Sequence, residues 1–359
     1  MTAVKHIDDL RGVGKLAVEA TKAVTDLVEA MQGAIGGPPA RLFSAPVYAT
    51  IRGITSVVGG ILDSALAQLA PFLGEGTASP ERGAALAALN GVLGDYLAET
   101  RNPLAIEMRL ARPEGASAKS KIAVFVHGSA MSRRVWQARR DLGYTPVYLD
   151  YNSGLHVSTN GRAFDALLET LVTEWPVPVD EIAIVAHSMG GLLTRGACHY
   201  AEEAKHRWRD KLRTIIFLGT PHHGAPLERA GNWLETLLGV TRYSAPFARL
   251  GKIRSAGVTD LRFGNVIDEH WQGRNRFELG TDARTPVPLP TGVECYTIAA
   301  EHDGLVPLAS AMGEHPNPAL RLDFPPSRRF VAEGVGHIQV LRESAVWEQI
   351  ERWLLASDT

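Results

Sequence analysis

One serine of this sequence stands where a hydroxyl group could act as a nucleophile. Ser188 follows an apolar run rich in β-branched residues, typical of a buried strand, and precedes a helical pattern that begins at Met189. Small residues occupy the crowded positions, Ala186 two before it and Gly190 two after it, as in a sharp strand-to-helix turn. Such a turn lifts the serine Oγ clear of the sheet and aims the Met189 N–H at an oxyanion. An ordinary helix-capping serine shares this local pattern, so the rest of the sequence must decide.

A serine nucleophile needs a general base, and the base needs a carboxylate that orients it. Asp303 follows a predicted strand at 294–299, and His337 lies between the last predicted strand and the final predicted helix. Ligands of parallel α/β sheets bind beyond the carboxyl ends of the strands. The order Ser188, Asp303, His337 therefore predicts a nucleophile, an acid and a base that meet at that edge.

Four other titratable residues compete for these roles. Asp323 also lies between the serine and His337, but a Phe-Pro-Pro sequence places it in an irregular segment, and His302 precedes the acid and so breaks the order. His222 and His223 follow a strand and are predicted to line the substrate pocket. Adjacent histidines diverge in direction and no third ligand has a defined spacing, so we expect no metal site and no organic cofactor.

A second oxyanion donor is expected in the loop after the first central strand. His127, Gly128 and Ser129 fill that place. The glycine lets the backbone approach the substrate, and the Ser129 N–H is the predicted partner of the Met189 N–H. His127 is expected to brace the loop, and with Gly128 and His187 it is assigned to the substrate pocket.

Strands alternate with helical patterns from residue 104 onward, which predicts an α/β fold with a mostly parallel sheet covered on both faces. The predicted strands are 106–110, 122–126, 146–151, 182–187, 214–218, 294–299 and 328–331. Helices are predicted around 135–142 and at 161–175, after Ser188, and at 338–355.

Two regions depart from this alternation. Residues 1–103 carry amphipathic helical patterns at 8–35, 51–69 and 79–97, read as a helical N-terminal region before a catalytic domain at 104–359. A lipid-surface anchor is the other interpretation, although Lys and Arg are sparse on its polar faces. Residues 225–291 are rich in aromatic residues and leucine and follow the strand after the serine, which predicts a lid over the active site.

The amino-acid composition limits the classes of molecule that the protein is expected to bind. The net charge of −2 gives no electrostatic case for nucleic acid. Two isolated cysteines make neither a disulfide framework nor a metal site, and no transmembrane run or secretory signal pattern is found. We expect a cytoplasmic protein acting on a small-molecule or lipid-like ester, with peripheral contact to a lipid surface left open.

The motifs together resemble the α/β-hydrolase superfamily and, more narrowly, lipase-like esterases near the GPI inositol-deacylase (PGAP1-like) branch. The resemblance covers residues 104 to the C-terminus, and in such enzymes Ser188, Asp303 and His337 occupy the catalytic positions and Ser129 and Met189 the oxyanion hole. The motifs are Val-His-Gly at 126–128, Ala-His-Ser-Met-Gly-Gly at 186–191, Gly-Thr-Pro-His-His-Gly at 219–224, Asp-Gly-Leu-Val-Pro at 303–307 and Gly-His at 336–337.

The sequence departs from that branch in two ways. Ala186 stands where many members have Gly, and the membrane segments of true GPI deacylases are missing from this sequence. We therefore predict a serine hydrolase that cleaves carboxylic esters with an apolar acyl group through an acyl-serine intermediate. An acyltransferase, a thioesterase or an amidase would use the same three residues, and a non-catalytic binding scaffold would keep only the fold.

Overall fold

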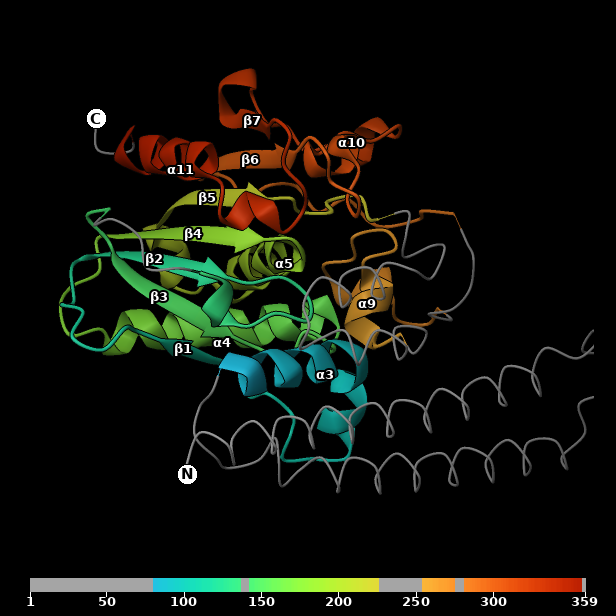
Figure 1. Ribbon diagram of the computed structural model, residues 1–359, viewed down its shortest axis with the longest axis horizontal. Helices are drawn as coiled ribbons and strands as arrows, with labels where there is room; N and C mark the ends of the chain where they lie inside the picture. Colours follow the sequence, from blue (N-terminus) through green and yellow to red (C-terminus); the bar gives the residue numbers. More distant parts are fainter. Residues whose placement is uncertain (1–79, 137–141, 226–253, 275–280, 357–359) are drawn as a thin grey trace, which may run out of the picture.

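The fold is built on one sheet. The computed structural model describes residues 80–136, 142–225, 254–274 and 281–356, and these residues form a seven-stranded sheet of order β1-β3-β2-β4-β5-β6-β7 (Figure 1). Strands β2 to β7 are parallel to one another, and β1 pairs antiparallel with β3 at one edge. The strands are β1 (Arg109–Ala111), β2 (Lys121–Val126), β3 (Thr145–Asp150), β4 (Glu181–His187), β5 (Leu212–Leu218), β6 (Glu294–Ala300) and β7 (Arg329–Ala332).

The strand order reverses next to β2. From β2 the chain moves to one side to form β3, and it then crosses to the other side for β4 and the strands that follow. Open α/β sheets bind ligands beyond the carboxyl ends of the strands at such a reversal. Ser129 follows β2 and Ser188 follows β4, so the topology brings the two predicted segments to neighbouring strand ends.

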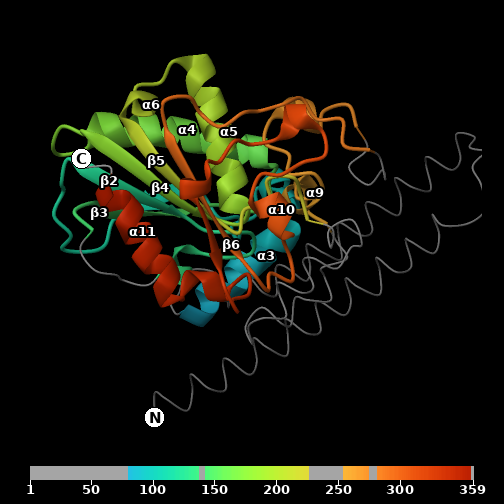
Figure 2. The same cartoon turned by 90° about the horizontal axis from the view of Figure 1, so that it is seen from above.

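Side chains of the central strands alternate between two apolar layers. On β4, Ile182 and Ile184 join one buried cluster, while Ala183 and Val185 join the other. Because both faces are covered, the central strands consist mostly of apolar residues, as is typical of parallel sheets. The first face is covered by α4 (Val157–Glu174), α5 (Met189–Ala204) and α6 (Trp208–Lys211), and the second by α11 (Ser344–Ala356) (Figure 2).

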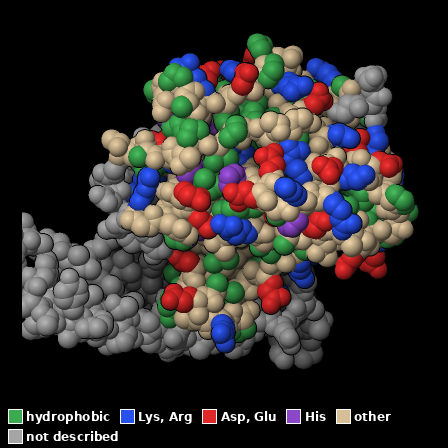
Figure 3. Space-filling view, turned by 180° about the vertical axis from the view of Figure 1, so that it is seen from behind, with side chains coloured by type: hydrophobic (Ala, Val, Ile, Leu, Met, Phe, Trp, Pro, Cys, Tyr) green, Lys and Arg blue, Asp and Glu red, His purple; other side chains and the backbone are tan. Residues whose placement is uncertain are grey.

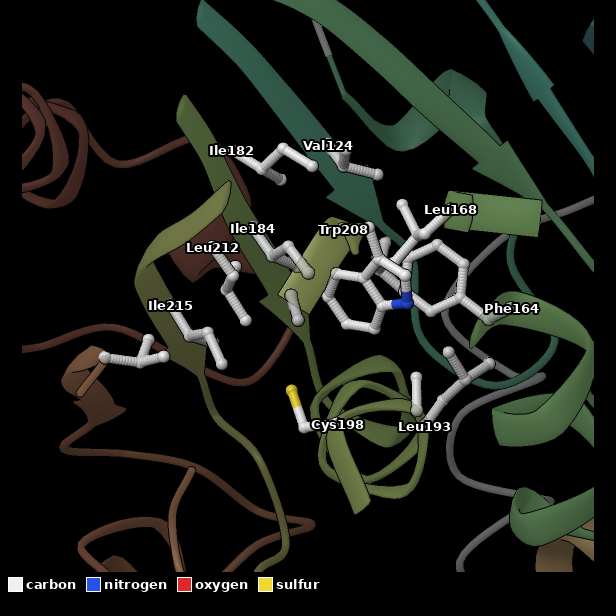
Figure 4. Packing of buried hydrophobic residues seen from close by; sticks show 14 of the residues in the cluster. Val124, Phe164, Leu168, Ile182, Ile184, Leu193, Cys198, Trp208, Leu212 and Ile215 are labelled. Carbon is white, nitrogen blue, oxygen red and sulfur yellow. The ribbon is translucent and has the colours of Figure 1, made fainter. Parts of the chain in front are cut away.

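Trp208 is the largest fully buried side chain of the first layer. Figure 4 shows its indole ring among side chains of the sheet and of α4, close to Phe164 and Leu168. The indole N–H donates to Asp165 Oδ1 at 2.7 Å, so the ring is buried without leaving its polar atom unpaired.

The predicted helix at 79–97 is present as α3 (Pro80–Glu99). Its apolar residues, including Leu89 and Leu93, join the cluster that also contains Met189. A glycine of α3 lies directly on the loop after β2, since a Cβ on Gly91 would lie 2.7 Å from the Cβ of Ala130. The helix therefore packs on loops at the carboxyl edge of the sheet. The predicted helices at 8–35 and 51–69 lie outside the described residues, and the boundary at residue 103 stays a prediction.

Parts of the predicted lid pack on this body. The helix α9 (Ala256–Asp260) is buried and contacts α3, where Ser255 Oγ donates to the carbonyl of Gly91 at 2.7 Å. Asp260 Oδ2 accepts from the N–H of Val157 at 2.8 Å and so caps α4. Residues 226–253 and 275–280 of the insertion lie outside the described residues, so the lid as a whole stays a prediction.

Three predicted elements differ from the structure. The first strand is shorter than 106–110, because the N–H of Ile106 donates to Asn90 Oδ1 of α3 instead of to a neighbouring strand. The helix around 135–142 is represented by a 3₁₀ turn, η1 (Arg133–Val135), and residues 137–141 are outside the described part. The final helix is interrupted, because Gln339 Oε1 accepts from the N–H of Gly336 and a 3₁₀ turn precedes α11.

The other short elements lie between β5 and α11. No helix within the described ranges combines the length and apolar character needed to cross a membrane. The short elements between β5 and α11 are η3 (Asp268–His270), α10 (Leu308–Ala311), η4 (Pro318–Leu320), η5 (Pro326–Arg328) and η6 (Gln339–Leu341).

Candidate active site

Ser188 occupies a sharp turn between β4 and α5. Its φ of 54° and ψ of −126° lie in a region that residues with a Cβ rarely adopt. The N–H of Ser188 donates to the carbonyl of Leu218 at 2.8 Å, and its carbonyl accepts from the N–H of Gly191 at 3.0 Å. A Cβ on Gly190 would lie 2.5 Å from the carbonyl oxygen of His127. The crowding predicted at this position is therefore present, and it is crowding against backbone.

Two side chains from later strand ends reach this serine. His337 Nε2 lies 2.9 Å from Ser188 Oγ, and His337 Nδ1 lies 2.7 Å from Asp303 Oδ2. Asp303 Oδ1 accepts from the N–H groups of Leu305 and Val306 at 2.9 and 2.8 Å, which fixes the carboxylate. The structure thus brings together the three residues in the order expected from the sequence.

These hydrogen bonds indicate which nitrogen of His337 carries the proton. A carboxylate can only accept, so the proton of neutral His337 lies on Nδ1 and its Nε2 is free to accept from the serine hydroxyl. The side chains of His337 and Asp303 are 4 % and 3 % exposed. An imidazolium formed at His337 would lie against a buried carboxylate in a medium of low dielectric constant, where opposite charges attract strongly.

The competing acid and base lie away from this chain. Asp323 is exposed in an irregular segment. The side chain of His302 is 72 % exposed and lies 3.9 Å from Glu301 Oε2. No hydrogen bond links either residue to Ser188 within the described part of the chain.

The loop after β2 approaches the serine closely. A Cβ on Gly128 would lie 3.0 Å from the Cβ of Ser188, so a larger residue would push the loop away. Ser129 is buried, and the following residue Ala130 has a φ of 56°, with its N–H donated to Ser153 Oγ at 2.9 Å. Met189 is the first residue of α5, where backbone N–H groups lack acceptors within the helix. The oxyanion roles of Ser129 and Met189 stay predictions.

The predicted pocket histidines His127 and His187 are buried supports of the site. His127 donates through Nδ1 to the carbonyl of Gly128 at 2.8 Å and stacks on Tyr151 at 4.4 Å. His187 donates through Nε2 to the carbonyl of His337 at 3.0 Å. Burial lowers the pKa of His127 to about 4, and burial followed by the nearby His337 ring lowers the pKa of His187 well below its usual value. Both rings are therefore neutral at pH 7.

His222 and His223 have different surroundings. The ring of His222 is fully buried between Phe217 and Phe324. His223 lines a cavity of about 450 Å³ that is also bordered by Asp282 and His315. Burial lowers the pKa of His223 to about 3. Among the described residues, no group of three or more His, Cys, Asp or Glu side chains could hold a metal ion.

Sequence reasoning missed two contacts that position His337. The hydrogen bond from His187 Nε2 joins the turn at Ser188 to the backbone of the loop that carries His337. Gly219 has a φ of 54°, and a Cβ there would lie 3.2 Å from His337 Nδ1 and 3.4 Å from Asp303 Oδ2. The glycine at the end of β5 was a visible signal for a close approach, but the sequence could not show which side chain fills the space.

Comparison with known proteins is consistent with this architecture. Residues 164–283 match the family model of the PGAP1-like alpha/beta domain. A search of curated proteins finds no match.

Three solved structures are among those that a structure search finds similar to this chain. The Bacillus licheniformis lipase BlEst2 in mature form is 16 % identical, with 69 % of this chain and 98 % of that chain covered and a TM-score of 0.45. The type II thioesterase YbtT of the yersiniabactin pathway is 14 % identical, with 69 % and 97 % covered and a TM-score of 0.42. The phospholipase PlaB from Legionella pneumophila is 17 % identical, with 53 % and 45 % covered and a TM-score of 0.34. From its sheet order and its family match, the chain has the fold of the α/β-hydrolase superfamily and, over residues 164–283, is similar to the PGAP1-like alpha/beta domain.

Proposed function

We propose that this protein is a serine hydrolase that cleaves carboxylic esters through an acyl-serine intermediate. The observation that carries the proposal is the hydrogen-bonded chain from Ser188 Oγ through His337 to Asp303, with distances of 2.9 and 2.7 Å. A serine hydroxyl is a weak nucleophile at neutral pH and becomes effective when a base within hydrogen-bond reach takes its proton. The strained backbone of Ser188 adds support, because such strain gathers at functional sites.

The first half-reaction forms the acyl-enzyme. Ser188 Oγ attacks the ester carbonyl carbon as His337 Nε2 takes the hydroxyl proton, and Asp303 stabilises the resulting imidazolium. The N–H groups of Ser129 and Met189 bind the negative oxygen of the tetrahedral intermediate. When the intermediate collapses, the C–O bond to the alcohol breaks and His337 gives its proton to the leaving oxygen.

The second half-reaction returns the serine. His337 Nε2 takes a proton from water as the water oxygen attacks the acyl carbon. The new tetrahedral intermediate expels Ser188 Oγ, which regains a proton from His337, and the carboxylic acid leaves. The balance requires only ester and water, so the residues of this chain suffice for the reaction.

The substrate class follows from the insertion after β5. Residues 225–291 are rich in leucine and aromatic residues, and they follow the strand whose end lies next to Ser188 and His337. Binding sites for small molecules are generally lined by apolar side chains. We infer an apolar acyl group on a small or lipid-like ester.

Covalent labelling tests the nucleophile. A fluorophosphonate probe should label the wild-type protein, and Ser188→Ala should remove both the labelling and the hydrolysis of p-nitrophenyl esters. Loss of the nucleophile is expected to lower kcat by about 10⁴-fold or more, with the circular dichroism spectrum unchanged. A variant that keeps more than about a tenth of the wild-type rate contradicts the assignment.

Product analysis separates the related reactions. Hydrolysis gives the free acid even when a second alcohol is present, whereas an acyltransferase would give the new ester. A thioester and an amide substrate of matched acyl chain compare the leaving groups. A protein that binds esters but neither reacts with the probe nor turns them over would be a binding scaffold.

A further inference from the structure

A buried guanidinium on the helix that follows Ser188 has no anionic partner among the described residues. Arg195 of α5 is 4 % exposed, and its Nη2 donates to the carbonyl of Val287 at 2.5 Å. Its Nε and Nη1 atoms are buried and have no hydrogen-bond partner in the described part of the chain. An unpaired buried charge is among the most costly groups in a protein interior.

Two more polar side chains without partners face the same region. Gly191 and Arg195 are four residues apart and so share one face of α5, and a Cβ on Gly191 would lie 2.1 Å from Thr220 Oγ1. The hydroxyl of Thr220 therefore lies against this face. Thr220 Oγ1 and both ring nitrogens of His222 are buried without a hydrogen-bond partner in the described ranges. Both residues are fully buried.

The neighbouring charges do not balance Arg195. Arg284 already pairs with Asp282, with Nη2 to Oδ2 at 2.8 Å and Nε to Oδ1 at 2.9 Å. Burial raises the pKa of Cys198 and Cys295, the second to about 12, so both thiols near Arg195 are neutral. Among the described residues, the charges of Arg195, Arg284 and Asp282 together leave one positive charge unmatched.

The protonation states of Arg195 and His222 agree with a positive electrostatic potential around them. Burial, followed by the nearby Arg284, lowers the pKa of Arg195 to about 9. Burial, followed by the charge of Arg195, lowers the pKa of His222 well below its usual value, so the ring is neutral and offers one N–H. The unused donors are then two atoms of Arg195, the hydroxyl of Thr220 and one nitrogen of His222.

We propose that Arg195, Thr220 and His222 form a buried binding site for one small monovalent anion of the size of chloride. The donors match an anion because each can point an N–H or O–H at one acceptor, and the single unmatched charge sets the valence. The ion must be small because all three side chains are enclosed. Water could accept the same hydrogen bonds but would leave the charge of Arg195 uncompensated.

The position of the site links it to the stability of the active-site scaffold. Arg195 belongs to the helix that begins directly after Ser188, and Thr220 follows Gly219, which lies against His337. An ion held between them would tie α5 to the loop after β5. The proposal concerns stability, and it holds or fails independently of ester hydrolysis.

The test compares thermal unfolding of the full chain in sodium gluconate and in sodium chloride at constant ionic strength, since gluconate is too large for an enclosed site. A ligand that binds only the folded state stabilises it in proportion to the logarithm of its concentration. The Tm should rise by about 2 °C for each tenfold increase in chloride above the Kd. A Tm that does not respond to chloride overturns the proposal.

Three variants assign the effect to these residues. Arg195→Met should lose the chloride dependence and, in gluconate, should be at least as stable as the wild type. Thr220→Val keeps the shape but removes a donor, so the response should move to higher chloride. The control is Arg207→Met, because the Arg207 side chain is 67 % exposed and pairs with Glu169 at the surface; it should keep the full response. An unchanged response in both Arg195→Met and Thr220→Val overturns the proposal.

Discussion

Ser188 and Asp303 show how single residues are prepared for chemistry by the backbone around them. The serine keeps a strained conformation because hydrogen bonds from β5 and α5 hold its N–H and its carbonyl. The carboxylate accepts two backbone N–H groups through one oxygen and uses the other for His337. Each side chain therefore reaches the reaction with little freedom left to lose.

Replacing the acid tests its role without removing its backbone contacts. In Asp303→Asn, the amide oxygen can still accept from Leu305 and Val306, while the amide N–H₂ faces His337 Nδ1 and favours the wrong ring tautomer. We expect kcat for ester hydrolysis to fall by about 10⁴-fold with the fold retained. The matched control is Asp323→Asn, which should stay within about twofold of the wild type. If Asp323→Asn cripples the enzyme and Asp303→Asn is mild, the acid has been assigned to the wrong residue.

The identity and order of these residues could be predicted from the sequence, whereas the contacts that hold them in place could not. Ser188, Asp303 and His337 could be placed because each follows a strand in a topology whose strand ends converge. The bond from His187 to the carbonyl of His337 could not be predicted, because it joins the end of β4 to a loop 150 residues later and depends on a side-chain direction. For the same reason, the sequence did not show that Gly219 makes room for His337.

Among the elements, α3 has a larger part in the site than its place outside the predicted domain suggests. Asn90 donates to the carbonyl of Leu104 at 2.8 Å and accepts from the N–H of Ile106 at 2.9 Å, so it binds the chain that leaves the helix. Gly91 lies on Ala130, the residue after Ser129. The Ala- and Gly-rich composition of this helix makes it only weakly amphipathic in the sequence. In the structure, the same small residues let its backbone approach the loop after β2 closely.

Two glycines of α3 provide a matched pair of substitutions. A Cβ on Gly94 would lie 1.8 Å from Asn152 Oδ1 and 3.0 Å from the Cα of Gly154, whereas a Cβ on Gly83 meets only the flexible side chain of Arg134, at 3.5 Å. Gly94→Ala should therefore lower the free energy of unfolding by about 1–3 kcal/mol through overpacking. Gly83→Ala should raise it by about 0.5–1 kcal/mol through helix propensity.

Urea denaturation measures both substitutions through the midpoint at constant m-value. The opposite signs are the informative result, since the two changes are chemically identical and lie in one helix. Equal effects of the same sign would mean that α3 does not pack on the loop after β3 as described.

At the scale of the molecule, we expect the buried neutral histidines of the described residues to make its stability depend on pH. Burial lowers the pKa to about 4 for His127 and His270 and to about 3 for His223, and it lowers the values of His187 and His222 well below the usual range. A histidine of the unfolded chain has a pKa of about 6.5. Between that pH and the lowered pKa values of the folded chain, the unfolded chain binds protons that the folded chain does not. Unfolding therefore takes up protons, and stability is full above about pH 6.5 and is lost as pH falls.

Urea denaturation from pH 7.5 to 4.5 checks this sign. Each such histidine contributes at most about 1.4 kcal/mol per pH unit to the slope. His270→Asn should reduce the proton uptake by one, because it removes a buried ring that bonds to Thr285 and Val266. A free energy of unfolding that stays constant down to pH 5 contradicts the buried neutral state of these rings.

The face of the molecule in Figure 3 carries acidic and basic side chains intermingled. Together with a net charge of −2, this gives that surface no strong field of one sign for a polyanion such as nucleic acid. We therefore expect substrate selection to depend on apolar contacts, as proposed above for the insertion at 225–291.

The acyl chain length of the preferred substrate is the prediction that tests this insertion. Burial of each substrate methylene contributes about 0.8 kcal/mol, close to fourfold in rate. If the insertion forms an apolar acyl channel over Ser188, kcat/KM should rise from p-nitrophenyl acetate toward longer esters until the channel is full. The variants Trp233→Ala and Phe247→Ala, at positions outside the described residues, should shift the optimum length or flatten the profile. If these aromatic residues belong only to an ordinary core, acetate will be the best substrate, and both variants will lower the Tm while the chain-length profile keeps its shape.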